Sequence, residues 1–195
     1  SGTGSLSTSY EVIGNSGTGV FTQTGGTNTI TNEFTIGINS GSSGTYNLSG
    51  GTNNVTNDLT IGLFSGSSGT YTISGETLDV TGSIVNGLGD STFNNDGGTL
   101  NVGGTIDVDT YGLGITSGSN VSHTTATTPN LTFDNLNVGG AGTGTFTHSD
   151  GSTLGLTDLS LGMDSGGSGT YTISNGTLNV SGDVVNGAGT GTLNI

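Results

Sequence analysis

The chain has no lysine, arginine, cysteine or tryptophan, and one proline among its 195 residues. Without cations its formal charge at pH 7 is −14. Nucleic acids are excluded as partners, because their phosphates are bound chiefly by lysine and arginine. Electrostatic docking to anionic membranes is excluded on the same ground, and no apolar run is long enough for membrane insertion. The lack of cysteine excludes disulfides.

The residues that are present are mostly small and polar. Glycine accounts for 41 residues, and hydrophobic residues make up 28% of the chain. A sequence of this composition can be a disordered linker. Regular spacing of apolar residues is not expected of such a linker, so periodicity distinguishes a linker from a folded chain.

The sequence repeats itself. Residues 65–87 and 165–187 are identical at 16 of 23 positions and start 100 residues apart. Within this long repeat, a large apolar residue recurs at intervals of 22 to 28 residues. These anchor residues are Phe21, Tyr46, Tyr71, Phe93, Val121, Phe146, Tyr171 and Leu193. The spacing predicts two super-repeats of ~100 residues, about 1–95 and 96–195, with four coils each.

Each short repeat contains three stretches in which apolar and polar residues alternate, separated by Gly, Ser and Asn. This pattern is typical of short strands joined by turns. Apolar residues four and then two positions apart mark the second and third stretches, as in Ile30, Phe34 and Ile36. The opening segment fits the same spacing through Leu6, Tyr10 and Val12, and we therefore expect these residues to face the core.

These features predict an all-β protein, a parallel β-solenoid with about 25 residues per coil. We expect it to be right-handed and three-sided and to form a single domain over residues 1–195. Its coils stack because none of them can bury its apolar face alone. The core columns are expected to hold Leu6, Tyr10, Val12, Phe21, Tyr46, Tyr71, Phe93, Phe146, Tyr171, Leu193 and Ile195.

The segments GVFTQTGGTNTI, GTYTISGETLDV and GTFTHSDGSTLGL resemble repeats of bacterial surface proteins. They are similar to autotransporter-passenger-associated repeats and to the GTFTQSGGT-type arrays of large secreted bacterial proteins. The resemblance covers nearly the whole chain and implies a β-solenoid at the cell surface or outside the cell. Many such arrays are stalks, adhesins or matrix components, and the resemblance implies no catalytic residues.

Four carboxylates, Glu33, Asp58, Asp158 and Asp183, each lie one residue before the first apolar residue of a third strand. Stacked carboxylates repel one another unless a cation lies between them, and calcium is bound by carboxylate and carbonyl oxygens. One interpretation is therefore a calcium site along this column. The other is a solvated acidic edge that keeps the protein soluble. The nonapeptide repeat GGxGxDxUx of calcium-binding solenoids is absent.

The two histidines, His123 and His148, are 25 residues apart and are expected to lie one above the other in adjacent coils. Such a pair suits either a transition-metal site or a polar ladder at a corner. Paired threonines such as Thr70 and Thr72 place rows of hydroxyl groups on the outer faces, which resemble those of ice-binding solenoids. Because no Lys or Arg is available to stabilise developing charge beside paired carboxylates, we expect no enzymatic activity.

The repetition favours a structural role: a subunit or segment of a head-to-tail β-solenoid filament, or a fibre of the cell surface or extracellular matrix. The closing residues GTGTLNI match a first strand and the opening residues match a second and a third strand, so one copy continues the repeat of the next. The 195 residues are either a whole subunit or a window of a longer chain. The alternative is an adhesin or an ice- or glycan-binding stalk that recognises surface glycans through its Thr- and Asn-rich faces, with the irregular segment 116–130 as its binding loop.

Overall fold

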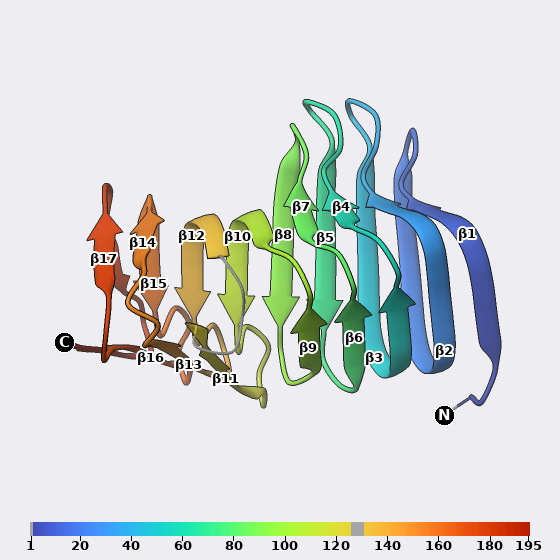
Figure 1. Ribbon diagram of the computed structural model, residues 1–195. Helices are drawn as coiled ribbons and strands as arrows, with labels where there is room; N and C mark the ends of the chain where they lie inside the picture. Colours follow the sequence, from blue (N-terminus) through green and yellow to red (C-terminus); the bar gives the residue numbers. More distant parts are fainter. Residues whose placement is uncertain (1, 126–130) are drawn as a thin grey trace. The chain divides into compact units, whose positions relative to one another are not determined.

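The computed structural model describes residues 2–125 and 131–195 (Figure 1). The described residues form strands and contain no α-helix, and hence no helix that could cross a membrane. Strands of successive turns pair in parallel at intervals of about 25 residues. The chain is therefore a parallel β-solenoid, which confirms the fold class predicted from the sequence.

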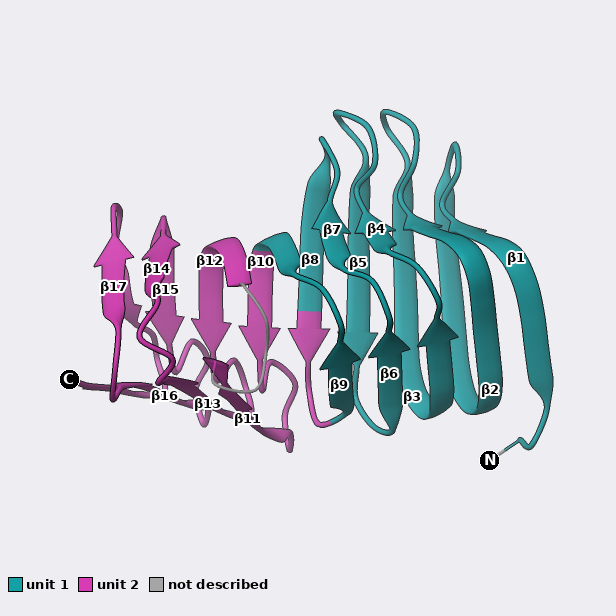
Figure 2. Ribbon diagram, in the orientation of Figure 1, with its two compact units in different colours: residues 1–93, 98–109 teal, residues 94–97, 110–195 magenta. Residues whose placement is uncertain are grey.

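Contacts divide the chain into two compact units, coloured separately in Figure 2. Unit 1 comprises residues 1–93 and 98–109, and unit 2 comprises residues 94–97 and 110–195. Strands β8 (Asp90–Asn95) and β10 (Ile106–Leu113) contribute residues to both units. The other strands of unit 1 are β1 (Ser5–Ile13), β2 (Thr18–Ile36), β3 (Ser43–Val55), β4 (Leu59–Ile61), β5 (Ser68–Ile73), β6 (Thr77–Val80), β7 (Ile84–Asn86) and β9 (Thr99–Val102). Those of unit 2 are β11 (Asn120–Thr124), β12 (Leu131–Val138), β13 (Thr143–His148), β14 (Thr153–Leu156), β15 (Asp158–Leu161), β16 (Ser168–Ile173), β17 (Thr177–Val180), β18 (Val184–Asn186) and β19 (Thr190–Asn194).

A turn of the solenoid consists of three strand segments. In the turn that begins with β3, residues 43–48, 52–55 and 59–61 pair with β5, β6 and β7 of the next turn. We call these segments the first, second and third strands of a coil. Along β5 and β6, buried and half-exposed residues alternate, because successive side chains of a strand point to opposite faces.

The first strands stack their anchor side chains inside the solenoid. In unit 1 the rings of Phe21, Tyr46, Tyr71 and Phe93 lie face to face, with centroids 4.9, 4.9 and 5.5 Å apart. Tyr46, Tyr71 and Phe93 are fully buried, whereas Phe21, at the end of the column, is half-buried. In unit 2, Phe146 and Tyr171 are also fully buried, with ring centroids 5.2 Å apart.

The opening strand departs from the expected register. Glu11 and Ile13 lie opposite Phe34 and Ile36, because an irregularity between Thr8 and Tyr10 shifts the pairing of β1 with β2. Tyr10 and Val12 therefore point outward, with 61% and 41% of their surface exposed. Their assignment to the core is wrong, and Glu11 takes the inward position.

Three further residues assigned to the core lie at open edges. Leu6 lies opposite the buried Asn28, in an inward column, but stays 46% exposed because β1 is at the edge of its sheet. Leu193 lies opposite Tyr171 on the edge strand β19 and is 39% exposed. Ile195 is almost fully exposed.

The anchor of strand β11 is also different from the one expected. His123 lies opposite Phe146, whereas Val121 lies opposite Gly144. The imidazole ring of His123 stacks on the ring of Phe146 with centroids 5.3 Å apart. The residue opposite His123 in the next turn is Phe146, 23 residues further on, and not His148, which is 25 residues further on. The two histidines are therefore not stacked on each other.

A buried asparagine accompanies a tyrosine in the aromatic column. Asn53 is fully buried, and its Nδ2 donates a hydrogen bond to the hydroxyl of Tyr71 at 2.9 Å. In the next turn, the residue opposite Asn53 is Leu78, and the ring stacked on Tyr71 is Phe93. The hydroxyl and the amide that bonds it are thus replaced together, so neither group is present without the other in these two turns.

Removing one member of the Asn53–Tyr71 pair should cost more than replacing both. Tyr71→Phe leaves Asn53 Nδ2 buried without its acceptor, which should lower the free energy of unfolding by about 1–3 kcal/mol. The double variant Asn53→Leu, Tyr71→Phe copies the Leu78–Phe93 combination and should recover most of this loss. Urea denaturation of the wild type, both single variants and the double variant measures the coupling. Losses that simply add in the double variant would contradict it.

Candidate functional site

The first candidate site is the end of unit 1 formed by β1 and residues 18–24 of β2, which we call the N-terminal face. Residues 18–24 pair with β3 on one edge, whereas β1 pairs only with residues 27–36 of β2. Within residues 2–125 and 131–195, no strand pairs with the other edge of residues 18–24. A hollow of about 350 Å³, lined among others by Leu6, Phe21 and Gln23, lies along this edge. The face therefore combines unpaired backbone groups with a hollow.

Polar side chains inside the solenoid form a network beneath this hollow. The Tyr46 hydroxyl donates to Gln23 Oε1 at 2.6 Å, and Asn28 Nδ2 donates to the Tyr46 oxygen at 3.1 Å. Asn28 Nδ2 also donates to Glu11 Oε2 at 2.8 Å, and Gln23 Nε2 donates to the Thr52 carbonyl at 3.0 Å. These hydrogen bonds fix the positions of the buried polar side chains beneath the hollow.

Glu11 places a carboxyl group in an otherwise apolar inward column. The residues in line with it in the following turns are Phe34, Leu59 and Ile84, and Glu11 itself is 8% exposed. Burial raises the pKa of Glu11, and the hydrogen bond from Asn28 opposes this shift. An inward-pointing charge at a sheet edge is a known barrier to the addition of further strands. The register expected for β1 was one residue off, so Glu11 was not predicted to face inward.

The second candidate site is the end of unit 2 formed by β17, β18 and β19, which we call the C-terminal face. Each of these strands pairs on one edge, with β14, β15 and β16 respectively, and the described residues supply no strand for the other edge. Inward-facing side chains that are buried in the preceding turn are exposed in this one. Leu159 is fully buried, whereas Val184, which lies opposite it, is 52% exposed. The C-terminal face is thus apolar, with open strand edges.

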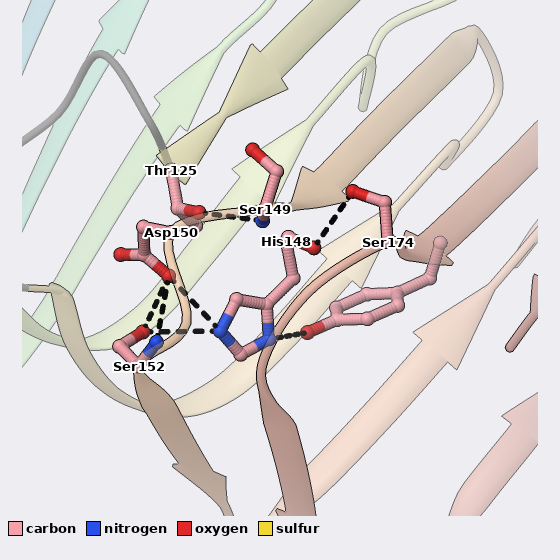
Figure 3. A network of polar contacts seen from close by, with 7 residues as sticks. Thr125, His148, Ser149, Asp150, Ser152 and Ser174 are labelled. Carbon is pink, nitrogen blue, oxygen red and sulfur yellow. Dashed lines mark hydrogen bonds and ion pairs between the residues drawn. The ribbon is translucent and has the colours of Figure 1, made fainter.

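A third cluster surrounds the fully buried His148 in unit 2 (Figure 3). His148 Nε2 lies 3.0 Å from Ser152 Oγ and 3.3 Å from Asp150 Oδ1, and Nδ1 lies 3.3 Å from the hydroxyl of Tyr171. The hydroxyl and the backbone N–H of Ser152 both donate to Asp150 Oδ1, at 2.7 and 3.1 Å. These hydrogen bonds from Ser152 lower the pKa of Asp150.

Ser152, His148 and Asp150 are the residue types of the catalytic triad of hydrolases, and they lie in contact with one another. In such a triad the carboxylate bonds the imidazole nitrogen that does not face the serine. Here Ser152 and Asp150 approach the same nitrogen of His148, and the other nitrogen faces Tyr171. The Ser152 N–H bond to the side chain of Asp150 instead forms an Asx turn. The cluster is suited to holding the turn between β13 and β14.

His123 occupies an apolar site in unit 2. Its ring lies between Phe146, on which it stacks, and Tyr111, whose hydroxyl lies 3.0 Å from His123 Nδ1. The other nitrogen, Nε2, is buried and has no hydrogen-bond partner among the described residues. Burial lowers the pKa of His123 from its ordinary value of 6.5 to about 4. The imidazole is therefore neutral in the folded protein near pH 7.

Two carboxylates of the acidic column predicted for calcium make hydrogen bonds between turns. Asp58 Oδ1 accepts the backbone N–H of Ser83 at 2.7 Å, and Asp158 Oδ1 accepts that of Asp183 at 2.8 Å. Glu33 Oε1 accepts the hydroxyl of Thr35 at 3.1 Å. In the described part of the chain, no three His, Asp or Glu side chains are grouped as for a metal ion. Asp58 and Asp158 thus bond backbone groups of the next turn, which favours the structural interpretation of this column over the calcium site.

The outward threonines of unit 2 form aligned rows. Thr145 lies opposite Thr170 and Thr147 opposite Thr172, on strands whose outward residues are mostly half-exposed. The segment 116–130 that was considered as a binding loop contains residues 126–130, which lie outside the described residues.

No family model, curated protein or solved structure matches the chain.

Acid should destabilise the protein through His123. The unfolded chain binds the proton more tightly than the folded one, so this contribution is complete above pH 6.5 and is lost as the pH falls toward 4. At pH 4 the loss should be about 3 kcal/mol relative to pH 7. His123→Phe, which suits the aromatic column, should remove this part of the pH dependence. Denaturant titrations of both proteins from pH 7 to 4 test this, and parallel pH profiles would contradict it.

Calcium should stabilise the protein no more than sodium does at equal ionic strength. Specific binding to the folded state would raise the melting temperature by mass action. Asp58 and Asp158 already accept backbone N–H groups, so we expect both salts to act only by screening the negative charge. Thermal unfolding in matched CaCl₂ and NaCl series measures this, and a selective rise with calcium would establish the site.

Proposed function

We propose that the chain is a structural protein of the cell surface or extracellular matrix, a subunit or segment of a head-to-tail β-solenoid filament. The observation that carries this proposal is the in-register stacking of turn on turn, in which anchors such as Tyr46 and Tyr71 take the same position in successive turns. Each turn buries its apolar side chains against its neighbours, so a stack of this kind is extended by further turns of the same chain or of another copy.

Exposed strand edges are templates for pairing with another chain, and repeat proteins normally cover them with polar capping repeats. The C-terminal face has no such cap among the described residues, since Val184 and Leu193 are 52% and 39% exposed. Stacking a further coil on these residues removes apolar surface from water, which favours association. The contact joins two different faces, so it does not close and generates a filament.

The hydrogen bonds of several polar side chains and the resemblance of the repeats also support a structural role. The His148 cluster bonds a turn, and Asp58 and Asp158 bond backbone groups of the next turn, so these polar groups serve the scaffold. The resemblance of the repeats to those of bacterial surface proteins supports a bacterial origin and an extracellular location. No partner other than a second copy and no cofactor is needed for this function.

A second candidate function is binding through the threonine rows, as an adhesin or an ice- or glycan-binding stalk. The observation that favours it is the alignment of Thr145 with Thr170 and of Thr147 with Thr172 on neighbouring strands. Such rows hold hydroxyl groups at the regular spacing of a sheet, ~4.8 Å between strands. This function predicts thermal hysteresis or glycan retention by the wild type that is lost when Thr170 is replaced by a bulky tyrosine, with filaments left intact, and the absence of both activities in the wild type would contradict it.

The filament proposal predicts a specific effect at Leu193. Leu193→Asp would bury an unpaired carboxylate in the joint at a cost of about 3–5 kcal/mol. The critical concentration for assembly should therefore rise by about 100-fold or more. Leu88→Asp adds the same charge at a residue that is 77% exposed and outside both faces, and it should assemble like the wild type. Negative-stain microscopy and sedimentation at increasing NaCl measure this.

A stable monomer of the wild-type chain at high concentration in physiological salt, with no filaments on the grid, would contradict the proposal. So would equal assembly of the Leu193→Asp variant and the wild type.

A further inference from the structure

We propose that Asn175 is a site of spontaneous covalent modification, in which its side-chain amide reacts with the backbone nitrogen of Gly176. The two residues form the turn between β16 and β17 of unit 2, and both are exposed to water. The products are an aspartate or an isoaspartate at position 175. Because the reaction uses only water and the chain itself, the modified fraction increases with the age of the molecule.

The reaction has two steps. The nitrogen of Gly176 attacks Cγ of Asn175, the new C–N bond closes a succinimide ring, and the side-chain nitrogen leaves with the amide proton as ammonia. Water then adds to one carbonyl carbon of the ring and breaks its bond to the nitrogen, which takes up a proton. Opening at Cγ gives aspartate, and opening at the main-chain carbonyl gives isoaspartate, in which the backbone continues through the side chain. Both products carry a carboxylate in place of a neutral amide.

The structure distinguishes Asn175 from other asparagines that precede a glycine. The sequence contains three such pairs, Asn86–Gly87, Asn175–Gly176 and Asn186–Gly187. The N–H of Gly87 donates to the carbonyl of Ile61 at 3.0 Å, and the N–H of Gly187 donates to that of Leu161 at 3.0 Å. The N–H of Gly176 makes no hydrogen bond among the described residues. Only the nitrogen of Gly176 can therefore attack without first leaving a hydrogen bond between turns.

The free nitrogen is a property of this turn in both copies of the long repeat. Gly75 and Glu76 occupy the same places in the first copy, and β6, which follows them, pairs with β9 of the next turn. Glu76 is exposed and its N–H makes no hydrogen bond among the described residues, although a further turn is stacked on this one. A further turn stacked on Asn175 and Gly176 would therefore leave the nitrogen of Gly176 free as well.

The fold requires the glycine that makes Asn175 reactive. Gly176 has a φ of 133°, which residues with a side chain rarely adopt. An added Cβ would lie 2.6 Å from Nε2 of His148 and 2.8 Å from the carbonyl oxygen of Ser152. The cluster around His148 thus packs against the backbone of Gly176 and leaves no room for a Cβ. The absence of a Cβ also leaves the attacking nitrogen unshielded.

Modification would change a contact between two turns of unit 2. The carbonyl of Asn175 accepts the N–H of Gly151 at 3.2 Å, and the N–H of Asn175 donates to the carbonyl of His148 at 3.3 Å. Isoaspartate lengthens the backbone beside these bonds, and either product adds a negative charge next to the turn that carries Asp150. The chain has no Lys or Arg to pair with the new charge, so like charges face each other across neighbouring turns. We expect the modified protein to be less stable than the unmodified one.

Incubation of the wild-type chain at pH 8.5 and 37 °C tests the proposal. Samples are digested with pepsin at low pH, because trypsin has no Lys or Arg to cut after, and mass spectrometry measures the conversion of each amide to an acid. Asn86 is the internal control. We expect Asn175 to react at least ~10-fold faster than Asn86, because the nitrogen of Gly87 must first leave its backbone hydrogen bond. In guanidinium chloride the two rates should become similar.

Equal rates at Asn175 and Asn86 in the folded protein would overturn the proposal. A rate ratio that is the same in guanidinium chloride as in buffer would also overturn it, because the local sequence and not the turn would then control the reaction.

A second measurement tests the effect of the modification on stability. Asn175→Gly removes the reactive amide and copies Gly75, the residue at the same place in the first copy of the long repeat. After incubation, the wild type should unfold at a lower temperature than fresh wild type, whereas the variant should unfold at the temperature of the fresh variant. An equal decrease in both proteins would show that position 175 is not responsible and would overturn this part of the proposal.

Discussion

The in-register pairing of each turn with the next is the constraint on which the rest of this structure depends. Tyr46 lies opposite Tyr71 and Thr45 opposite Thr70, so a residue type suited to a position in one turn is also suited to it in the next unless its partners change with it. The same pairing brings backbones so close that Gly44 has no room for a Cβ beside Ile13. The near-identity of distant segments is thus a consequence of stacking: burial, backbone hydrogen bonds and close packing impose the same requirements on every turn.

The fold could be predicted from the sequence, because in-register stacking makes the anchor residues recur at a regular spacing. The register could not be predicted correctly at two places. In β1, Val12 and Ile13 are both apolar, so alternation alone does not say which faces inward, and the irregularity between Thr8 and Tyr10 reverses the expected answer. In β11 the anchor is the polar residue His123. An apolar residue was expected at the anchor position, and Val121 was therefore assigned to it.

The interior polar groups could not be located before the turns were aligned. Asn53 resembles a loop residue in the sequence, and its partner Tyr71 lies 18 residues further on, in the next turn. A signal was nevertheless present: Asn28 and Tyr46 have the same separation and the same hydrogen bond, whereas Leu78 is followed by Phe93. Polar and apolar partners therefore change together across turns, and this pattern becomes readable once the register is known.

A chain without lysine or arginine must satisfy its carboxylates by other means. Asp58 and Asp158 accept backbone N–H groups, but Glu11 keeps one oxygen without a partner among the described residues, at the N-terminal face. Because the sequence has no Lys or Arg to pair with Glu11, the hydrogen bond from Asn28 is the contact that offsets the burial of this carboxyl group.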